Sequence, residues 1–234
     1  MSKIAVIPAR GGSKRIPKKN SKYFLGKPII AYSIEAALAS NLFDEVMVST
    51  DDEAIAEIVK GYGATVPFLR SDKNADDHAI LVDVLLEVLA SYKSIGKTFD
   101  QVCCILPTAP FISEQKIQES FKTLIDNDFE SVFPVLEFSY PIQRALQIDN
   151  DQVSMVWHEH ETARSQDLEK RYHDAGQFYW SKVTSLETDK KLFTKNSGAI
   201  VISELEAQDI DTETDWKLAE IKYKLQLDNE KTNL

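Results

Sequence analysis

The chain has 234 residues, of which 43% are hydrophobic, so it is long enough for one large domain with a packed core. Its net charge of −10 argues against a general nucleic-acid-binding protein, because an acidic body repels long polyanions. The sequence shows neither a signal-peptide pattern nor an apolar stretch of membrane-spanning length, so we expect a cytoplasmic protein that does not bind membranes.

Strand and helix patterns alternate along the first half of the chain. Apolar runs of strand length alternate with segments whose apolar residues recur at helical spacing. This order predicts an α/β fold with a Rossmann-like, mostly parallel sheet and helices on both faces. The predicted strands are 4–8, 45–49, 65–69, 102–106 and 131–136, and the predicted helices are 28–39, one capped by Thr50 or Asp51, 78–91 and one capped by Ser113.

The pattern changes after residue 136. Residues 137–180 are mixed, aromatic and polar without a helical pattern, which predicts short antiparallel strands in a small arm. A strand at 198–202, a helix capped by Thr212 and a polar tail from residue 228 complete the chain. We therefore expect residues 1–136 and 181–234 to form one nucleotide-binding α/β domain, with the arm 137–180 inserted in it.

The two cysteines, Cys103 and Cys104, are adjacent in a predicted strand. Adjacent strand residues point to opposite faces of a sheet, so these two thiols are poorly placed for an intrachain disulfide. We expect both to be reduced and buried.

A strongly basic segment follows the first predicted strand. Eight of the 27 basic residues precede Glu35, the first acidic residue, and the segment also contains Gly11-Gly12-Ser13. Such a run is often only a solvated charged surface, but its place after a buried strand favours a phosphate-binding loop. The segment lacks the Gly-Lys-Ser/Thr ending of a P-loop and the Gly-x-Gly-x-x-Gly of a dinucleotide fold, so neither class is supported.

Asp209 and Asp211 flank a single apolar residue, so their carboxylates lie on one face of an extended chain. Carboxylate oxygens suit Mg²⁺, which also takes phosphate oxygens and water. The cluster equally suits the start of the helix that Thr212 begins, and the pattern itself leaves both interpretations open.

Other polar residues fall at predicted strand ends or in an aromatic block. Arg70 suits either a ligand contact or a surface salt bridge, and Thr108 either a ligand contact or a plain turn. Residues 172–180 are rich in aromatics, which is more typical of a core or an interface than of a pocket. The histidines show no recognised zinc spacing.

The segment from Ile7 to Asn20 closely resembles the signature of the CMP-sialic acid synthetase-like cytidylyltransferases, which activate sialic-acid-like sugars. The resemblance covers essentially the whole chain, and within the family it is strongest to the pseudaminic acid branch. The segments that carry it further are Arg70, Asp77, 107–110, 209–211 and 215–220 for the family, and 103–111, 138–146 and 172–180 for the branch.

This resemblance implies transfer of CMP from CTP to the anomeric hydroxyl of a nine-carbon keto sugar acid, with release of pyrophosphate, for surface glycan or flagellin glycosylation. Pseudaminic acid is the expected acceptor. The alternatives are another nonulosonic acid, such as sialic or legionaminic acid, or a non-catalytic nucleotide-binding protein. The resemblance also implies a homodimer in which the arm 137–180 reaches the partner's site.

The site residues are implied in the same way. Arg10, Lys19 and Asp211 are expected to be catalytic, and Asp209 and Asp211 to bind Mg²⁺. The expected nucleotide-binding residues are Ala9, Arg10, Gly12, Ser13, Lys14, Lys19, Asn20, Arg70, Asp77 and Thr108. The expected sugar-binding residues are Gln143, Arg144, Tyr172, Gln177 and Tyr179, with Arg144 as the partner of the sugar carboxylate.

Overall fold

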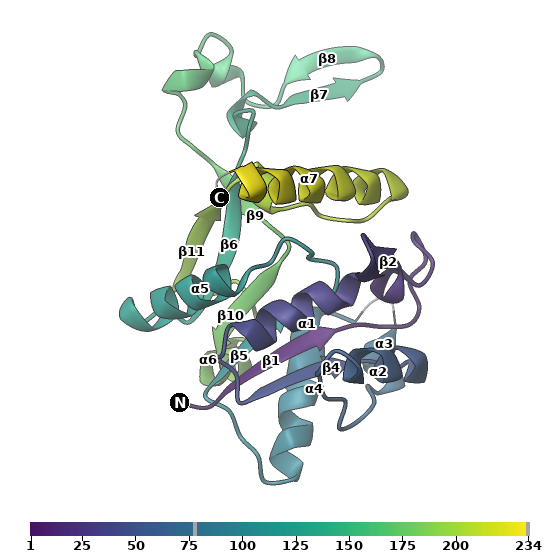
Figure 1. Ribbon diagram of the computed structural model, residues 1–234. Helices are drawn as coiled ribbons and strands as arrows, with labels where there is room; N and C mark the ends of the chain where they lie inside the picture. Colours follow the sequence, from purple (N-terminus) through teal and green to yellow (C-terminus); the bar gives the residue numbers. More distant parts are fainter. Residues whose placement is uncertain (77–78, 233–234) are drawn as a thin grey trace.

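The computed structural model describes residues 1–76 and 79–232, and it centres on one mixed β-sheet (Figure 1). The strand order is β11-β6-β10-β5-β1-β4, and β9 also pairs with β6. All of these strands run parallel except β9 and β10, so the prediction of a Rossmann-like, mostly parallel sheet is confirmed. The strands are β1 (Lys3–Pro8), β4 (Glu45–Ser49), β5 (Gln101–Ile105), β6 (Ser131–Glu137), β9 (Tyr172–Asp174), β10 (Phe178–Lys182) and β11 (Ser197–Ile202).

Helices cover both faces of this sheet, as the sequence predicts. Alternate residues of β1 supply two separate cores, because successive strand side chains point to opposite faces. Ala5 and Ile7 belong to a core shared with α1, α2 and α5, whereas Ile4 and Val6 belong to one shared with α4 and α6. The helices are α1 (Ile29–Ala39), α2 (Glu53–Lys60), α4 (Leu81–Ser94), α5 (Glu114–Asp126) and α6 (Val183–Asp189).

The adjacent cysteines follow the same alternation. Cys103 lies in the first core and Cys104 in the second, and both are free and fully buried. Burial raises the pKa of both thiols, that of Cys104 to about 12. The prediction of two buried, unpaired thiols on opposite faces is confirmed.

The central sheet also includes the last strands of the predicted arm. β10 lies between β5 and β6 and runs antiparallel to both. β9 pairs antiparallel with residues 135–137 of β6. The residue-180 boundary that we predicted therefore falls within β10. The part that projects from the sheet carries the hairpin β7 (Leu146–Asp149) and β8 (Gln152–Met155), beyond α7 in Figure 1.

The C-terminal helix α7 (Glu213–Thr232) packs on the segment that follows β1. Phe24 and Trp216 meet edge to face in a third core, which also contains Ile16. Thr212 caps this helix as predicted: its Oγ1 accepts from the Asp215 N–H at 3.3 Å, and Asp215 Oδ2 accepts from the Thr212 N–H at 2.7 Å. The short hairpin β2 (Tyr23–Phe24) and β3 (Lys27–Pro28) joins β1 to α1.

Three local predictions differ from the structure. The predicted strand 65–69 is only an isolated bridge between Met47 and Thr65, because Pro67 cannot donate a ladder hydrogen bond. Helix α4 begins at Leu81 rather than at 78, and α7 continues to Thr232, through most of the segment expected to be a tail. The short helix α3 (Asp72–Ala75) and α6 were not predicted. In the described part of the chain, no helix has the length and apolar character needed to cross a membrane.

Candidate active site

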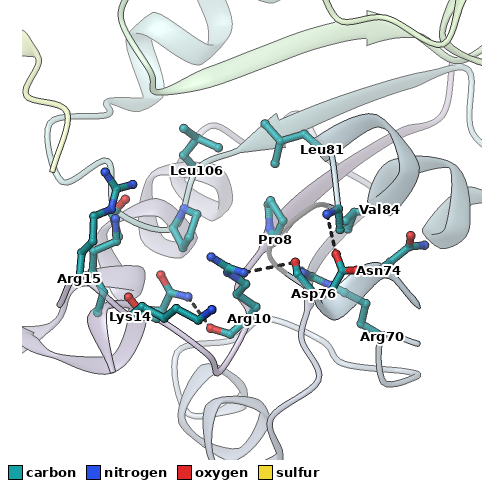
Figure 2. Close-up of a pocket in the computed structure, with 16 residues that line it drawn as sticks. Pro8, Arg10, Lys14, Arg15, Arg70, Asn74, Asp76, Leu81, Val84 and Leu106 are labelled. Atoms are coloured by element: carbon teal, nitrogen blue, oxygen red, sulfur yellow. Dashed lines mark hydrogen bonds between the residues drawn. The ribbon is translucent and has the colours of Figure 1, made fainter. Parts of the chain in front are cut away.

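A cavity of about 450 Å³ lies at the carboxyl ends of β1, β4 and β5 (Figure 2). This is the edge at which parallel α/β sheets bind ligands. The cavity is lined by Pro8, Arg10, Ser13, Lys14, Arg15, Lys19, Asn20, Arg70, Asn74, Asp76, Ala79, Leu81, Val84, Leu106, Pro107 and Thr108.

The glycine-rich loop after β1 is held in place by its neighbours. The Gly11 N–H donates to Asp51 Oδ1 at 3.0 Å, and Asn20 Nδ2 donates to the Arg10 carbonyl at 2.9 Å. A Cβ at Gly11 would lie only 2.7 Å from Asp52 Oδ2, so a larger residue would displace the side chain that caps α2. At Gly12, by contrast, a Cβ would meet no atom within 4 Å.

Several cationic side chains line this cavity. Lys14 and Arg15 come from the loop, and Arg10 extends toward the middle of the cavity, where its Nη1 donates to the Asp76 carbonyl at 3.2 Å. Lys19 Nζ donates to the Ile210 carbonyl at 2.6 Å. This arrangement suits a ligand with several negative charges close together, such as a polyphosphate.

Arg70 forms a buried part of the wall. Its Nε donates to Ser49 Oγ at 3.0 Å, and its Nη2 donates to the Ser49 carbonyl. Burial lowers its pKa from the ordinary value, while the charge of Asp51 opposes that effect. Two hydrogen bonds thus fix Arg70 to Ser49 at the end of β4.

The remaining wall is apolar. Figure 2 shows Leu81 and Val84 of α4 on one side, with Leu106 after β5 and Pro8 at the end of β1. A cavity with cations on one side and apolar groups on another suits an organic molecule that carries a phosphate chain. Transfer of a phosphoryl group depends mainly on positioning and charge stabilisation, which such a lining can supply.

Asp209 and Asp211 lie beside the cationic loop, separated by the fully buried Ile210. Asp211 Oδ1 is 2.7 Å from Arg15 Nη2 and 3.6 Å from Lys19 Nζ. Partial withdrawal from water raises the pKa of Asp209, and the charge of Asp211 adds to that rise.

These carboxylates fit a divalent cation only in combination with other ligands. The start of α7 is already capped by Thr212 and Asp215, so this cap does not use the carboxylates of Asp209 and Asp211. Within residues 1–76 and 79–232, no group of three or more His, Cys, Asp and Glu side chains is placed to hold a metal. Two hard oxygen donors suit Mg²⁺ when phosphate oxygens and water complete its octahedron.

Most of the predicted nucleotide-binding residues meet at this cavity. Ala9 lies behind it, fully buried, with its N–H bonded to the Ser49 carbonyl at 2.8 Å. Gly12 is on the loop but does not line the cavity, and Asp77 lies outside the described residues. The lining residues that the sequence predicted are Arg10, Ser13, Lys14, Lys19, Asn20, Arg70 and Thr108.

The predicted sugar-binding residues do not line this cavity of the single chain. Arg144 Nη1 donates to Ser165 Oγ at 3.4 Å and Gln143 Nε2 to the Glu169 carbonyl at 2.7 Å, both within the arm. Tyr172 is exposed on β9. Gln177 and Tyr179 are buried and bond to the Glu206 carbonyl and to Asp174, respectively.

Sequence reasoning missed several lining residues. Arg15 belongs to the basic segment that we identified, but no ligand role was assigned to it. Asn74 and the apolar side chains of α4 had no local signal, because only the packing of α3 and α4 brings them to the cavity.

A Rossmann-like sheet with a cationic loop at its carboxyl edge defines a nucleotide-binding α/β protein. The family model described as "Cytidylyltransferase" matches residues 4–226. The chain therefore belongs to the cytidylyltransferase family and is an enzyme of that class, as the resemblance in the sequence predicted.

Individual relatives agree with this assignment. The chain is 42% identical to the pseudaminic acid cytidylyltransferase of Campylobacter jejuni subsp. jejuni serotype O:2, over 96% of this chain and 97% of that protein. It is 34% identical to the CMP-N,N'-diacetyllegionaminic acid synthase of Legionella pneumophila, over 93% of this chain and 94% of that protein.

Among solved structures, a CMP:2-keto-3-deoxy-manno-octonic acid synthetase complexed with CTP superposes with a TM-score of 0.71. The match covers 97% of this chain and 100% of the other, at 18% sequence identity. This likeness establishes the shared fold.

Proposed function

We propose that this enzyme transfers CMP from CTP to the anomeric hydroxyl of pseudaminic acid and releases pyrophosphate. The use of CTP is supported by one observation: Arg10, Lys14 and Lys19 line the same cavity at the carboxyl edge of the sheet. The choice of sugar is supported by the 42% identity to the Campylobacter jejuni enzyme along nearly the full length of both chains.

In this proposal the loop cations bind and orient the triphosphate. The sugar hydroxyl attacks the α-phosphorus in line, and negative charge builds on the phosphate oxygens and the leaving pyrophosphate. Arg10 and Lys19, held by backbone carbonyls at 3.2 and 2.6 Å, stabilise that charge without having to be ordered during the reaction. Asn20, Arg70 and Thr108 form the wall that we assign to the cytidine.

Asp209 and Asp211 are the residues that would hold Mg²⁺. When bound, the ion would supply positive charge to the phosphate oxygens and favour loss of a proton from a coordinated oxygen. Asp211 lies 3.6 Å from Lys19, at the end of the loop, and the charge of Lys19 also acts on Asp209, so this pair suits a metal that contacts the phosphate chain.

We also propose that the enzyme is a homodimer joined through the arm. The register of β7 and β8 places Leu146, Ile148, Val153 and Met155 on one face, and Ile148 is 74% exposed. A two-stranded hairpin is marginally stable alone, so this apolar face favours burial against a second copy. In such a dimer, Gln143, Arg144 and Tyr172 of one arm would serve the partner's sugar site.

The decisive test is product formation from purified protein with CTP and Mg²⁺. Pseudaminic, legionaminic and N-acetylneuraminic acid are supplied separately, and CMP-sugar and pyrophosphate are measured by mass spectrometry and a coupled assay. We expect kcat/KM for pseudaminic acid to exceed the others by at least about tenfold, the effect of about 1.4 kcal/mol in the transition state.

Legionaminic acid is the second candidate, because a legionaminic acid synthase is 34% identical to this chain. Preferential turnover of that acid, or of N-acetylneuraminic acid, would exclude the proposed sugar but keep the cytidylyl transfer. No CMP-sugar from any of the three acids would exclude the proposed reaction.

A further inference from the structure

Arg15 connects the basic loop to the carboxylates that we assign to Mg²⁺. Its Nη2 lies 2.7 Å from Asp211 Oδ1, and its side chain also lines the cavity. Asp211 is therefore bound to a loop cation through one of the oxygens that a metal would use.

In the part of the chain that the structure describes, Arg15 and Lys19 pair with Asp211, and Arg15 is the more exposed of the two. The Lys19 side chain is only 20% exposed, and its Nζ is fixed to the Ile210 carbonyl at 2.6 Å. The Arg15 side chain is 67% exposed, and exposed ion pairs contribute little to stability, so this pair is readily broken. A guanidinium binds phosphate through two parallel hydrogen bonds, so a triphosphate competes well for Arg15.

We propose that Arg15 exchanges Asp211 for the nucleotide triphosphate, so that Asp211 becomes a good metal ligand only when the nucleotide is bound. The inference rests on the proposed function, because it takes the triphosphate to be the ligand of the cavity. Arg15 is then a positioning residue that acts on the metal through Asp211.

Charge balance explains why the exchange matters. Arg15 and Lys19 lie beside Asp211 and offset part of the negative charge of Asp209, Asp211 and Asp215, so a divalent cation gains less attraction. If Arg15 moved to the triphosphate, less positive charge would remain beside the carboxylates, and their attraction for a divalent cation would increase. Because coupling between two ligands is reciprocal, bound metal would also keep Arg15 on the nucleotide.

The test measures binding of each ligand without the other in the Arg15→Gln variant. Mn²⁺ alone is titrated by electron paramagnetic resonance, and CTP alone is titrated in EDTA by calorimetry. We expect Arg15→Gln to tighten Mn²⁺ binding and to weaken metal-free CTP binding, each by about fivefold, the low end of typical coupling. Shifts of opposite sign exclude a merely structural role for Arg15, which would weaken both affinities.

Two further variants complete the design. Lys122→Gln removes an exposed lysine that pairs with Asp126 on α5, outside the cavity lining, and we expect both affinities to stay unchanged. Arg15→Lys keeps the charge without the planar guanidinium, and we expect a smaller change of both affinities. Circular dichroism melting confirms that each variant is folded.

A result in which Arg15→Gln changes neither affinity, only one of them, or both in the same direction would overturn the proposed exchange. These measurements require no sugar acid and no turnover. The proposed exchange can therefore be wrong even if CMP-sugar is produced. Conversely, the proposed sugar can be wrong even if Arg15→Gln shifts the Mn²⁺ and CTP affinities in opposite directions.

Discussion

Asp211 is the residue at which the loop, the carboxylates and α7 meet. Its carboxylate faces Arg15 and Lys19, and its backbone N–H donates to Asp215 Oδ2 at 3.1 Å. The backbone bond belongs to the start of α7, whereas the carboxylate takes no part in that cap. A substitution that keeps the shape of the Asp211 side chain but removes its charge therefore tests the role of the carboxylate in the reaction without disturbing the start of α7.

For Asp211→Asn we expect pyrophosphate release to fall by about 10²–10⁴, the usual scale for lost charge stabilisation at a transferring phosphoryl group. The melting temperature is expected to remain close to that of the wild type, because the backbone bond to Asp215 is retained. Steady-state kinetics and circular dichroism provide the two readouts.

The matched control is Asp189→Asn, an equal change of charge at an exposed position at the end of α6, for which we expect wild-type turnover. Full activity of Asp211→Asn would remove Asp211 from the proposed metal site.

Single residues also show what the sequence predicted of the site. The loop cations were identified because charge and glycine are local signals, whereas Asn20 was assigned through the resemblance. Arg70 was identified as a nucleotide residue through the resemblance, since its burial against Ser49 depends on the packing of the chain around β4. Asn74 gave no signal, because its place at the cavity depends on a contact with another helix.

Glu87 of α4 holds the short helix α3 in place. Its carboxylate accepts from the Ser71 N–H at 2.8 Å, from the Ser71 hydroxyl at 3.1 Å and from the Asn74 amide. Partial burial by itself would raise the pKa of Glu87, but the hydrogen bonds from Ser71 and Asn74 and the charge of Arg70 outweigh it and lower the pKa.

A lowered pKa in the folded state means that Glu87 stabilises the fold in its charged form. This contribution is complete above the ordinary value of 4.5 and is lost as pH falls through the lower folded pKa. We expect Glu87→Gln to reduce the free energy of unfolding at pH 7 by about 1 kcal/mol. The difference from the wild type is expected to shrink as pH falls below 4.5.

Urea unfolding at a series of pH values measures this difference. Glu57→Gln, at an exposed pair with Lys60 on α2, serves as a control with little expected effect at any pH. A Glu87→Gln penalty that is the same at pH 3 and pH 7 would contradict the role of the charge.

The elements of the parallel sheet were predicted more accurately than those that interrupt it. β1, β4, β5 and β6 are continuous apolar runs, which is the pattern of strands buried on both faces. The place of β10 was not predicted, because pairing between β5 and β6 depends on residues far apart in the chain. We expected residues 172–180 to belong to the arm. Their aromatic character fits a sheet core and an interface equally well, so the sequence did not distinguish the two.

The sheet and the projecting hairpin differ in how they are stabilised. The sheet is covered by helices on both faces, whereas the apolar face of the hairpin is exposed in the single chain. Asn150 and Asp151 both have positive φ, which matches the two-residue turn that fixes the hairpin register. The proposed dimer would bury the apolar face.

For Ile148→Asp we expect a monomer by size-exclusion chromatography with light scattering, because the substitution places a charge in the proposed interface. We also expect loss of sugar transfer with CTP binding retained. Gln147→Asp changes the opposite, polar face of the same strand and is expected to remain dimeric. A dimeric Ile148→Asp variant, or a monomeric wild type, would refute the proposed interface.

The two buried cysteines make the unfolding of the sheet directly measurable. Cys103 and Cys104 occupy neighbouring positions of β5, yet each belongs to a different core. With their pKa values raised by burial, neither thiol reacts readily with an alkylating reagent while the sheet is closed. Mass spectrometry of the alkylated peptide therefore reports whether the two faces of the sheet open together or one after the other.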